Sequence, residues 1–165
     1  TGHHATTQLL IEWLDDLIAG GEIVLDIGTG SGILAMAALR FGAKQAIGVD
    51  CDPTAIECAG DYAKQNGFGE ELVLKVGSVA SLSPEEHPSI GLVLANLDRR
   101  TLRECMDLLG RYARQGARLL LSGLLAEQRS EMEQALAAES IYIRHVREKN
   151  GWIALEATAA ESCEA

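Results

Sequence analysis

An apolar run that passes directly into three glycines decides the fold of this chain: Val24-Leu25-Asp26-Ile27-Gly28-Thr29-Gly30-Ser31-Gly32. The apolar run is typical of a buried strand, and glycines spaced by single residues indicate a tight turn. Residues 33–39 are all apolar and predict a buried helix directly after the turn. Strand, turn and helix together form the first unit of a doubly wound sheet, in which a ligand lies over the turn.

The chemistry of the turn narrows the choice of ligand. A dinucleotide fingerprint, G-x-G-x-x-G, needs its third glycine where this chain has Ile33, and a P-loop needs a lysine directly after Gly32. The carboxylate of Asp26 would repel a pyrophosphate and attract a cationic amino group. The pattern therefore favours S-adenosylmethionine (SAM), with its ammonium and sulfonium, over a turn that binds nothing. We place Asp26, Gly28, Gly30 and Gly32 in the SAM site.

The rest of the chain alternates between strands and helices, as in a parallel sheet with helical crossovers. The expected strands are 23–27, 45–50, 72–76, 90–95 and 118–122. The expected helices are 8–18, capped by Thr6 or Thr7, then 31–41, 54–65, 102–112 and 126–138, with a loop over 81–89. Two last strands, 142–148 and 152–156, are joined by Asn150-Gly151, a strong hairpin signal. We predict one α/β domain over residues 1–165: a doubly wound, mostly parallel, Rossmann-like sheet of seven strands with a closing antiparallel hairpin and a frayed tail over 157–165.

Polar residues at the ends of later strands are the other site candidates. Asp50 ends the second strand, about 20 residues after the glycines, where such folds place a ribose-binding carboxylate. Cys51 follows it and belongs to the same predicted SAM site. Ser78 follows the third strand, where it would bond the adenine amino group or simply close a turn. Asn96 ends the fourth strand, where its carbonyl would accept a hydrogen bond from an attacking amine, unless it only caps the next helix.

The composition limits the partners. The formal net charge is −10, with no long basic run, which argues against direct nucleic-acid binding and suits a basic protein partner. Neither a signal peptide nor a membrane-spanning run occurs, and the four cysteines form no C-x-x-C pair. We therefore expect a cytoplasmic protein with free thiols, no membrane association and no metal site.

Several runs resemble one known family, the PrmA methyltransferases, over nearly the whole chain. The matching residues are Thr1-Gly2-x-His4-x-Thr6-Thr7, Trp13-Leu14-Asp15, 24–35, Ile47-Gly48-Val49-Asp50-x-Asp52-Pro53-x-Ala55-Ile56, Ala95-Asn96 and Leu121-Ser122-Gly123. The resemblance implies a class I methyltransferase fold, SAM as cofactor, and a protein of the large ribosomal subunit as methyl acceptor. By position, it also implies that Thr7, Gly28, Asp50 and Asn96 bind the cofactor. His4, in the lead-in that is specific to the family, is a candidate general base for the acceptor amine.

Three functions remain open at this point. The first is a SAM-dependent methyltransferase that acts on amino groups of a protein, with Asn96 and His4 as catalytic residues. The second keeps SAM but methylates a small molecule or a nucleic-acid base. The third is a binding module that holds SAM without catalysis. Trp13 and Trp152 are expected in the core rather than in the site.

Overall fold

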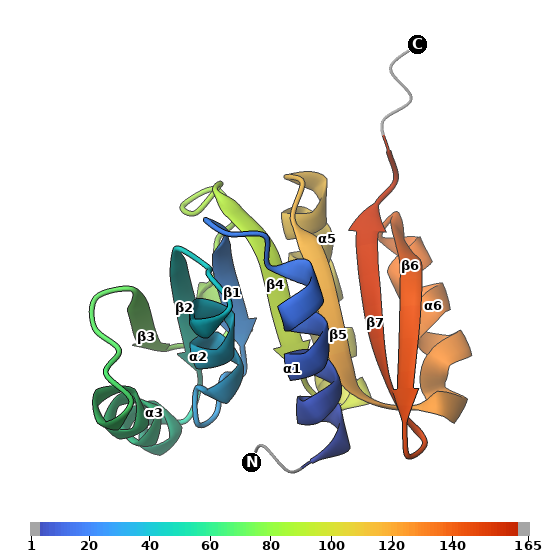
Figure 1. The fold of residues 1–165 in the computed structure, drawn as a ribbon. Coiled ribbons are helices and arrows are strands. Elements are labelled where there is room, and N and C mark those ends of the chain that lie inside the picture. The colour runs from blue at the N-terminus through green and yellow to red at the C-terminus, as the bar shows by residue number, and fades with distance from the viewer. Residues whose placement is uncertain (1–3, 162–165) are drawn as a thin grey trace.

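The computed structural model describes residues 4–161, which fold around one seven-stranded sheet (Figure 1). The strands are β1 (Ile23–Ile27), β2 (Gln45–Asp50), β3 (Leu72–Val76), β4 (Ile90–Asn96), β5 (Arg118–Leu125), β6 (Ile141–Lys149) and β7 (Trp152–Ala159). Their order is β3-β2-β1-β4-β5-β7-β6, with β1 to β5 parallel and β7 antiparallel to both of its neighbours. The predicted α/β class, strand number and closing hairpin are confirmed.

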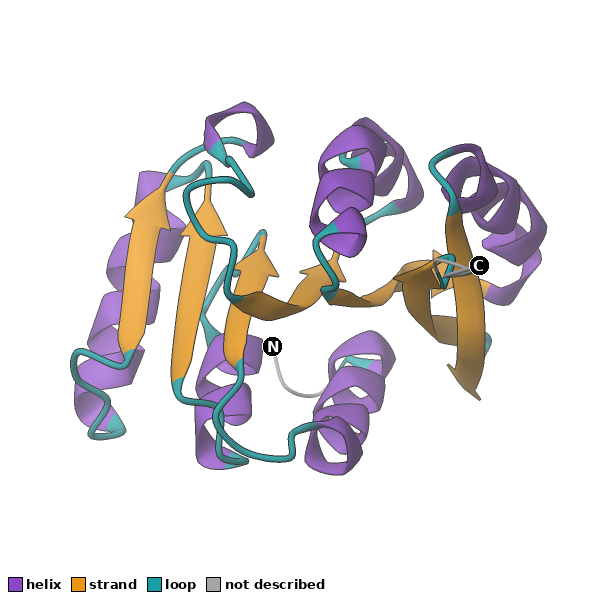
Figure 2. Cartoon of the chain, turned by 90° about the horizontal axis from the view of Figure 1, so that it is seen from above, coloured by secondary structure: helices purple, strands orange, loops and turns teal. Residues whose placement is uncertain are grey.

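Helices cover both faces of the sheet (Figure 2). They are α1 (Ala5–Leu17), α2 (Ile33–Arg40), α3 (Pro53–Gln65), α4 (Arg99–Glu104), α5 (Met106–Arg114) and α6 (Arg129–Ala138). The first three lie on one face and the last three on the other. Between β3 and β4 stands only the short 3-10 helix η1 (Val79–Ser81), and a second, η2 (Ala126–Gln128), precedes α6.

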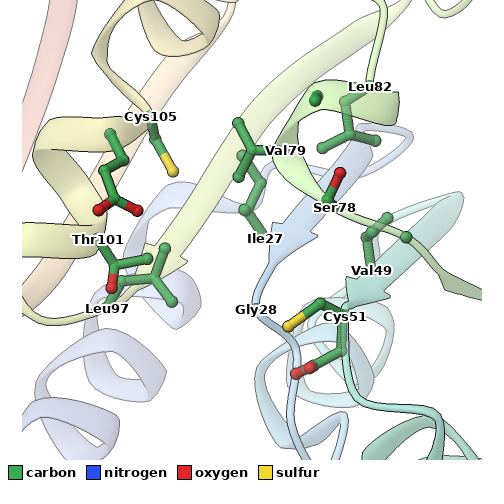
Figure 3. Close-up of a pocket in the computed structure, with 14 residues that line it drawn as sticks. Ile27, Gly28, Val49, Cys51, Ser78, Val79, Leu82, Leu97, Thr101 and Cys105 are labelled. Carbon is green, nitrogen blue, oxygen red and sulfur yellow. The ribbon is translucent and has the colours of Figure 1, made fainter.

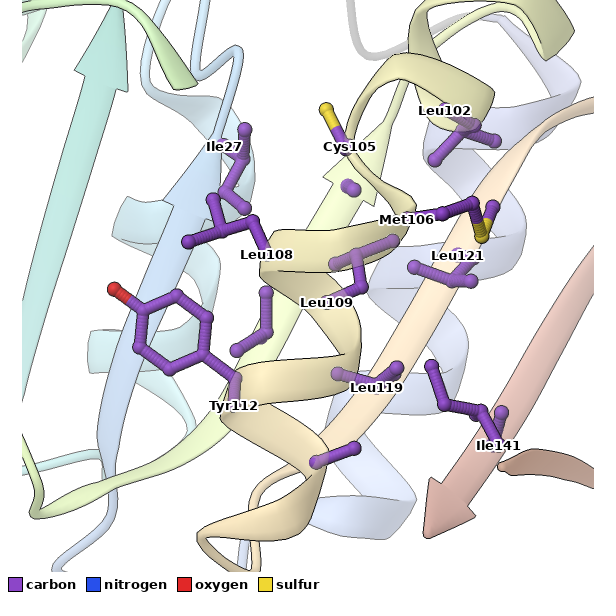
Figure 4. Close-up of a cluster of buried hydrophobic side chains, with 14 of the residues drawn as sticks. Ile27, Leu102, Cys105, Met106, Leu108, Leu109, Tyr112, Leu119, Leu121 and Ile141 are labelled. Carbon is purple, nitrogen blue, oxygen red and sulfur yellow. The ribbon is translucent and has the colours of Figure 1, made fainter. Parts of the chain in front are cut away.

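Alternation along the strands builds two hydrophobic cores. In β1, Val24 faces the cluster made with α1 and α2, whereas Leu25 and Ile27 face the cluster made with α4, α5 and α6. Figure 4 shows Leu108 and Tyr112 of α5 packed over the strands of this second cluster. Because full burial of one such side chain contributes about 1.5–3 kcal/mol, the two clusters stabilise the packing of the helices on both faces of the sheet.

The strand order reverses direction at β1. From β1 the chain winds outward through β2 and β3, and then crosses back to β4 on the other side of β1. Ligands of doubly wound sheets bind at such a switch point, beyond the carboxyl ends of the strands. The edge that carries the end of β1 and the end of β4 is therefore where a site is expected.

Two helix predictions need correction. Helix α1 begins at Ala5, capped by His4 rather than by Thr6 or Thr7, which are buried within its first turn. The helix expected over 102–112 is two helices that meet at Cys105. The first begins at Arg99, because the carboxylate of Asp98 accepts the N–H of Thr101 at 2.9 Å and caps it.

The carboxyl-terminal hairpin confirms one prediction and corrects another. Asn150 (φ 53°) and Gly151 (φ 79°) both adopt the left-handed region that a two-residue hairpin turn requires. The tail expected to fray from Ala157 begins later, since β7 runs to Ala159 and the Ala157 side chain is fully buried. Residues 157–159 belong to the sheet because β7 pairs with β5 on one side and with β6 on the other. Residues 162–165 lie outside the described part of the chain.

Candidate functional site

The glycine turn lies between the end of β1 and the start of α2. Gly28, Gly30 and Gly32 have φ of 71°, 55° and 80°, the left-handed region that glycine adopts without strain. The N–H groups of Gly28 and Thr29 both donate to the carbonyl of Val49, at 2.8 and 3.0 Å. The turn is therefore fastened to the neighbouring strand β2.

Gly28 is also fixed by its surroundings. A Cβ placed on it would lie 2.5 Å from the Cδ2 of Leu97, the residue that follows β4. The absence of a side chain thus lets the ends of β1 and β4 approach each other at the switch point. A larger residue would push Leu97 away and strain the backbone.

Asp26 lies beneath the turn rather than in an open space. Its side chain is 1% exposed, and its carboxylate accepts the hydroxyl of Thr29 at 2.7 Å. Burial raises its pKa from 3.8 to about 7, although the hydrogen bond from Thr29 acts in the opposite direction. Asp26 therefore supports the turn from inside the protein. Its direct contact with a ligand stays a prediction.

Asp50, at the end of β2, links the glycine turn to that strand. One carboxylate oxygen accepts the N–H of Gly30 at 2.9 Å, and the other accepts the N–H of Asp52 at 3.0 Å. The carboxylate stands half-buried at the end of β2. It is thus held in one orientation, with further lone pairs available to hydroxyl donors.

A cavity of about 410 Å³ opens beside Gly28 and Asp50, within the range of small-molecule sites. Its lining residues are mostly apolar and come from the ends of β1, β2 and β3, from η1 and from α4: Ile27, Gly28, Val49, Asp50, Cys51, Gly77, Ser78, Val79, Ala80, Leu82, Leu97, Thr101, Glu104 and Cys105. In Figure 3, Cys51 and Ser78 lie on one side of the cavity and Leu97, Thr101 and Cys105 on the other. The predicted residues Gly28, Asp50, Cys51 and Ser78 are thus brought together, whereas Asp26, Gly30 and Gly32 form the turn behind.

The wall formed by α4 and η1 could not be read from the sequence motifs. The one sequence signal for Val79, Leu82 and Leu97 is that they lie in the segments that follow β3 and β4. Thr101 and Glu104 line the cavity from α4, which begins at Arg99, three residues before the predicted helix. Cys105 at the helix junction is buried, and that burial raises the pKa of its thiol to about 11. The thiol is therefore protonated at neutral pH, and Cys105 contributes to the cavity only as part of its lining. Cys51 and Cys58 are exposed free thiols.

Thr7 and Asn96 meet at the same edge of the sheet. The first turn of α1 lies at the edge that carries the carboxyl end of β4 (Figure 1). There the Asn96 Nδ2 is 3.5 Å from the Thr7 Oγ1, a long hydrogen bond across 89 positions of sequence. Thr7 is 5% exposed, and Asn96 is half-buried. Two of the four residues that the family resemblance assigns to the cofactor are thus neighbours.

His4 stands at the start of α1 with defined partners. Its Nδ1 accepts the Thr6 N–H at 3.2 Å and lies 2.7 Å from the Thr6 hydroxyl. The ring makes an edge contact with Trp152, at 5.0 Å between ring centroids. A neutral imidazole has one nitrogen lone pair that can take a proton, and here the lone pair of Nδ1 accepts the Thr6 N–H as a helix cap.

A second, more open cavity of about 280 Å³ lies on the other side of the segment that follows Asn96. It is lined by Asp98, Arg99, Arg100, Gly123, Leu125, Gln128 and Trp152. Trp152 was expected in the core, but it is half-buried and lines this cavity, because it is the first residue of β7, next to the hairpin turn at one end of the strand. Trp13, by contrast, is 2% exposed, as predicted.

Two classes of feature are not seen among residues 4–161. No group of three or more His, Cys, Asp or Glu side chains there is arranged to hold a metal ion. Within the same residues, no helix combines the length and the apolar character needed to cross a bilayer.

Comparisons with known proteins agree on one family. The family model described as "Ribosomal protein L11 methyltransferase (PrmA)" matches residues 1–160. A ribosomal protein L11 methyltransferase of Edwardsiella ictaluri is 42% identical over 155 residues, which are 92% of this chain and 50% of that protein. One from Chromobacterium violaceum is 43% identical over 134 residues, covering 80% of this chain and 42% of that protein. The chain therefore spans about half the length of these relatives or less.

Solved structures show the same fold. The crystal structure of a ribosomal protein L11 methylase from Lactobacillus delbrueckii subsp. bulgaricus superposes with a TM-score of 0.85, at 29% identity, over 96% of this chain and 80% of that one. A magnesium protoporphyrin IX methyltransferase from Synechocystis, solved with bound SAM, gives a TM-score of 0.74 at 20% identity, over 96% of this chain and 80% of that one. The second likeness is one of fold alone.

Proposed function

This chain belongs to the ribosomal protein L11 methyltransferase (PrmA) family, and from that premise we propose that it binds SAM and transfers methyl groups to amino groups of a protein. The observation that carries the proposal is the cavity at the switch point, bounded by the glycine turn and by the fixed carboxylate of Asp50. A methyltransferase has to hold the acceptor amine next to the nucleoside site, and Asn96, although it does not line the cavity, ends β4 at the same edge of the sheet.

The residues of the cavity fit SAM in three parts. The Asp50 carboxylate suits the two ribose hydroxyls, each of which can donate to it. Ser78 and the apolar side chains of Val49, Val79 and Leu82 suit an adenine ring. Gly28 lines the cavity at the switch point, where the methionine end would lie.

Electrostatics favour a cationic ligand over a pyrophosphate. Asp50 lines the cavity, and Asp26 lies buried behind the turn with a pKa of about 7. A positive sulfonium or ammonium nearby would stabilise both carboxylates in their charged forms, whereas two phosphates would be repelled. Binding a cation there would also lower the pKa of Asp26.

Bound SAM supplies a methyl group on an activated sulfonium leaving group. The protein then has to align the acceptor amine with that methyl and exclude water, which contributes on the order of 7–11 kcal/mol when the alignment is good. Asn96 is suited to this step, because its carbonyl accepts an N–H of the amine and directs the nitrogen lone pair. Unlike a carboxylate, it would not hold the amine as an ammonium ion.

We propose a basic protein of the large ribosomal subunit as the acceptor, and the cytoplasm as the location. The family description and the acidic net charge of −10 support this choice. A basic, lysine-rich acceptor would be attracted to such a surface, and the interaction would be screened by salt. The acidic charge also argues against direct binding to nucleic acid.

Transfer of a labelled methyl group tests the proposal. The chain is incubated with methyl-labelled SAM and either purified ribosomal protein L11 or bulk ribosomal RNA, and Asn96→Ala is the matched variant. We expect label in lysine residues of the protein, little in the RNA, and a loss in Asn96→Ala that far exceeds its loss of SAM affinity. Label in RNA alone, or SAM binding without transfer to any acceptor, would reject the proposed activity.

A further inference from the structure

The imidazole of His4 is used as a helix cap. The first N–H groups of a helix have no partner within it, and one of them, that of Thr6, donates to the His4 Nδ1 at 3.2 Å. The carbonyl of His4 accepts the N–H of Gln8 at 3.0 Å and so begins the regular pattern of α1. The side chain and the backbone of His4 together fix the first turn.

A second contact fixes the ring itself. The His4 ring meets the Trp152 ring edge-on, with an angle of 69° between the ring planes and 5.0 Å between centroids. Trp152 begins β7 and is carried by the hairpin that closes the sheet. The orientation of the cap thus depends on a strand far away in the sequence.

The turn that His4 caps carries Thr7. The Thr7 Oγ1 lies 3.5 Å from the Asn96 Nδ2, so it takes the amino side of the amide. The carbonyl side then points away from Thr7 and is left for another donor. If the first turn of α1 moved, Thr7 would no longer hold the Asn96 amide in this orientation.

We propose that His4 is a positioning residue, whose imidazole caps α1 and thereby holds Thr7 against Asn96 with the amide carbonyl turned to the acceptor. This inference rests on the role proposed above for Asn96. It differs from the general-base role expected from the sequence, because a neutral ring that accepts at Nδ1 carries its proton at Nε2. His4 therefore acts through Thr7 and not on the amine.

Three variants separate the two roles. His4→Asn keeps a strong capping side chain but has no titratable ring, whereas His4→Ala has neither. His145→Ala, which removes a histidine on the outer strand β6 whose side chain is 72% exposed, is the matched control. All positions lie at the surface, and circular dichroism checks that each variant folds.

Two readouts are measured on each variant. The first is the NMR signal of the Asn96 side-chain NH2, with Thr7→Val as the reference for a broken contact. The second is kcat for methyl transfer to ribosomal protein L11 together with the dissociation constant for SAM. The NMR signal does not depend on methyl transfer, so failure of the proposed activity and failure of the positioning role are seen separately.

We expect His4→Ala to shift the Asn96 signal toward that of Thr7→Val and to lower kcat by about fivefold or more, in line with the loss of a helix cap. We expect His4→Asn to stay within about twofold of the parent chain in both readouts, and His145→Ala to match the parent. An Asn96 signal unchanged in His4→Ala would overturn the inference. So would a loss of kcat in His4→Asn as deep as in His4→Ala, which is the result for a general base.

Discussion

Asp50 serves the site in two ways, because it orders the glycine turn and faces the cavity. Its two oxygens accept the N–H groups of Gly30 and Asp52 at 2.9 and 3.0 Å. Further lone pairs remain for ribose hydroxyls, and hydrogen bonds to a charged acceptor contribute about 1.5–3 kcal/mol each. The carboxylate is therefore placed before the ligand arrives.

Replacement of Asp50 by alanine should weaken SAM binding at least tenfold, or by about 1.4 kcal/mol. Asp50→Asn is the control, since its amide keeps one acceptor for the turn but lacks the charge, and we expect an intermediate affinity. Calorimetric titration with SAM measures both. Unchanged affinity in Asp50→Ala would remove Asp50 from the site.

The buried Asp26 makes stability depend on pH. Burial raises its pKa from 3.8 to about 7, so the folded chain holds the proton more tightly than the unfolded chain. The stability from this group is complete below about pH 4 and is lost as the pH rises to about 7. Relative to Asp26→Asn, the free energy of unfolding should fall by up to about 4 kcal/mol over this range. Denaturant unfolding at a series of pH values measures it, and parallel pH profiles would contradict the assignment.

Among the secondary-structure elements, the paired carboxyl ends of β4 and β5 determine where Leu97 lies. The Leu97 N–H donates to the carbonyl of Ser122 at 3.1 Å, and its side chain contacts the position where Gly28 lacks a Cβ. Gly123, with φ of 92°, passes so close that a Cβ on it would overlap the Leu97 carbonyl. Gly28, directly after β1, and Gly123, on β5, therefore enclose Leu97 from the two strands that flank β4, and Leu97 lines the cavity.

Gly123→Ala should destabilise the chain by about 1–3 kcal/mol and weaken SAM binding, since Leu97 has to move. Gly116→Ala is the matched control, because its φ is 95° but no atom of the described chain lies within 4 Å of the added Cβ. It should show the backbone strain alone and leave SAM affinity unchanged. Thermal unfolding and SAM titration measure the pair; equal SAM affinities would show that the ends of β4 and β5 do not shape the cavity.

Sequence patterns predicted those elements whose signals are local. The glycine turn, the strands and the Asn150-Gly151 turn each depend on neighbouring residues; both turns lie where expected, and every strand begins within one residue of its predicted start, although β5 and β7 run three residues further than predicted. The start of α1 was missed because histidine seldom serves as a cap, and the break at Cys105 because apolar residues continue across it. Trp152 was assigned to the core because strand composition alone does not show which end of a strand opens into a cavity.

The candidate site could be predicted only in part, for the same reason. Gly28, Asp50 and Ser78 follow strand ends, and parallel strands bring those ends to one edge. Thr101, Glu104 and Cys105 line the cavity through the packing of α4, a tertiary contact that leaves no sequence signature. The family resemblance assigned Thr7 and Asn96 to the cofactor site, but neither it nor the spacing predicted the contact between them.

At the scale of the whole molecule, the net charge of −10 should affect the encounter with a basic acceptor. Attraction between opposite charges speeds association and is screened over about 8–10 Å at physiological salt. We expect kcat/KM for ribosomal protein L11 to fall severalfold as salt is raised, with little change in kcat. Steady-state kinetics across a salt series measures this, and a salt-independent kcat/KM would argue for an acceptor that is not basic.

We propose that the cavity at the switch point holds SAM. Isothermal titration of the chain with SAM, and separately with NAD, distinguishes this ligand from a dinucleotide. We expect saturable binding of one SAM per chain, weakened in Asp50→Ala, and no measurable binding of NAD. Binding of NAD in place of SAM, or no binding of SAM to the folded chain, would contradict this proposal.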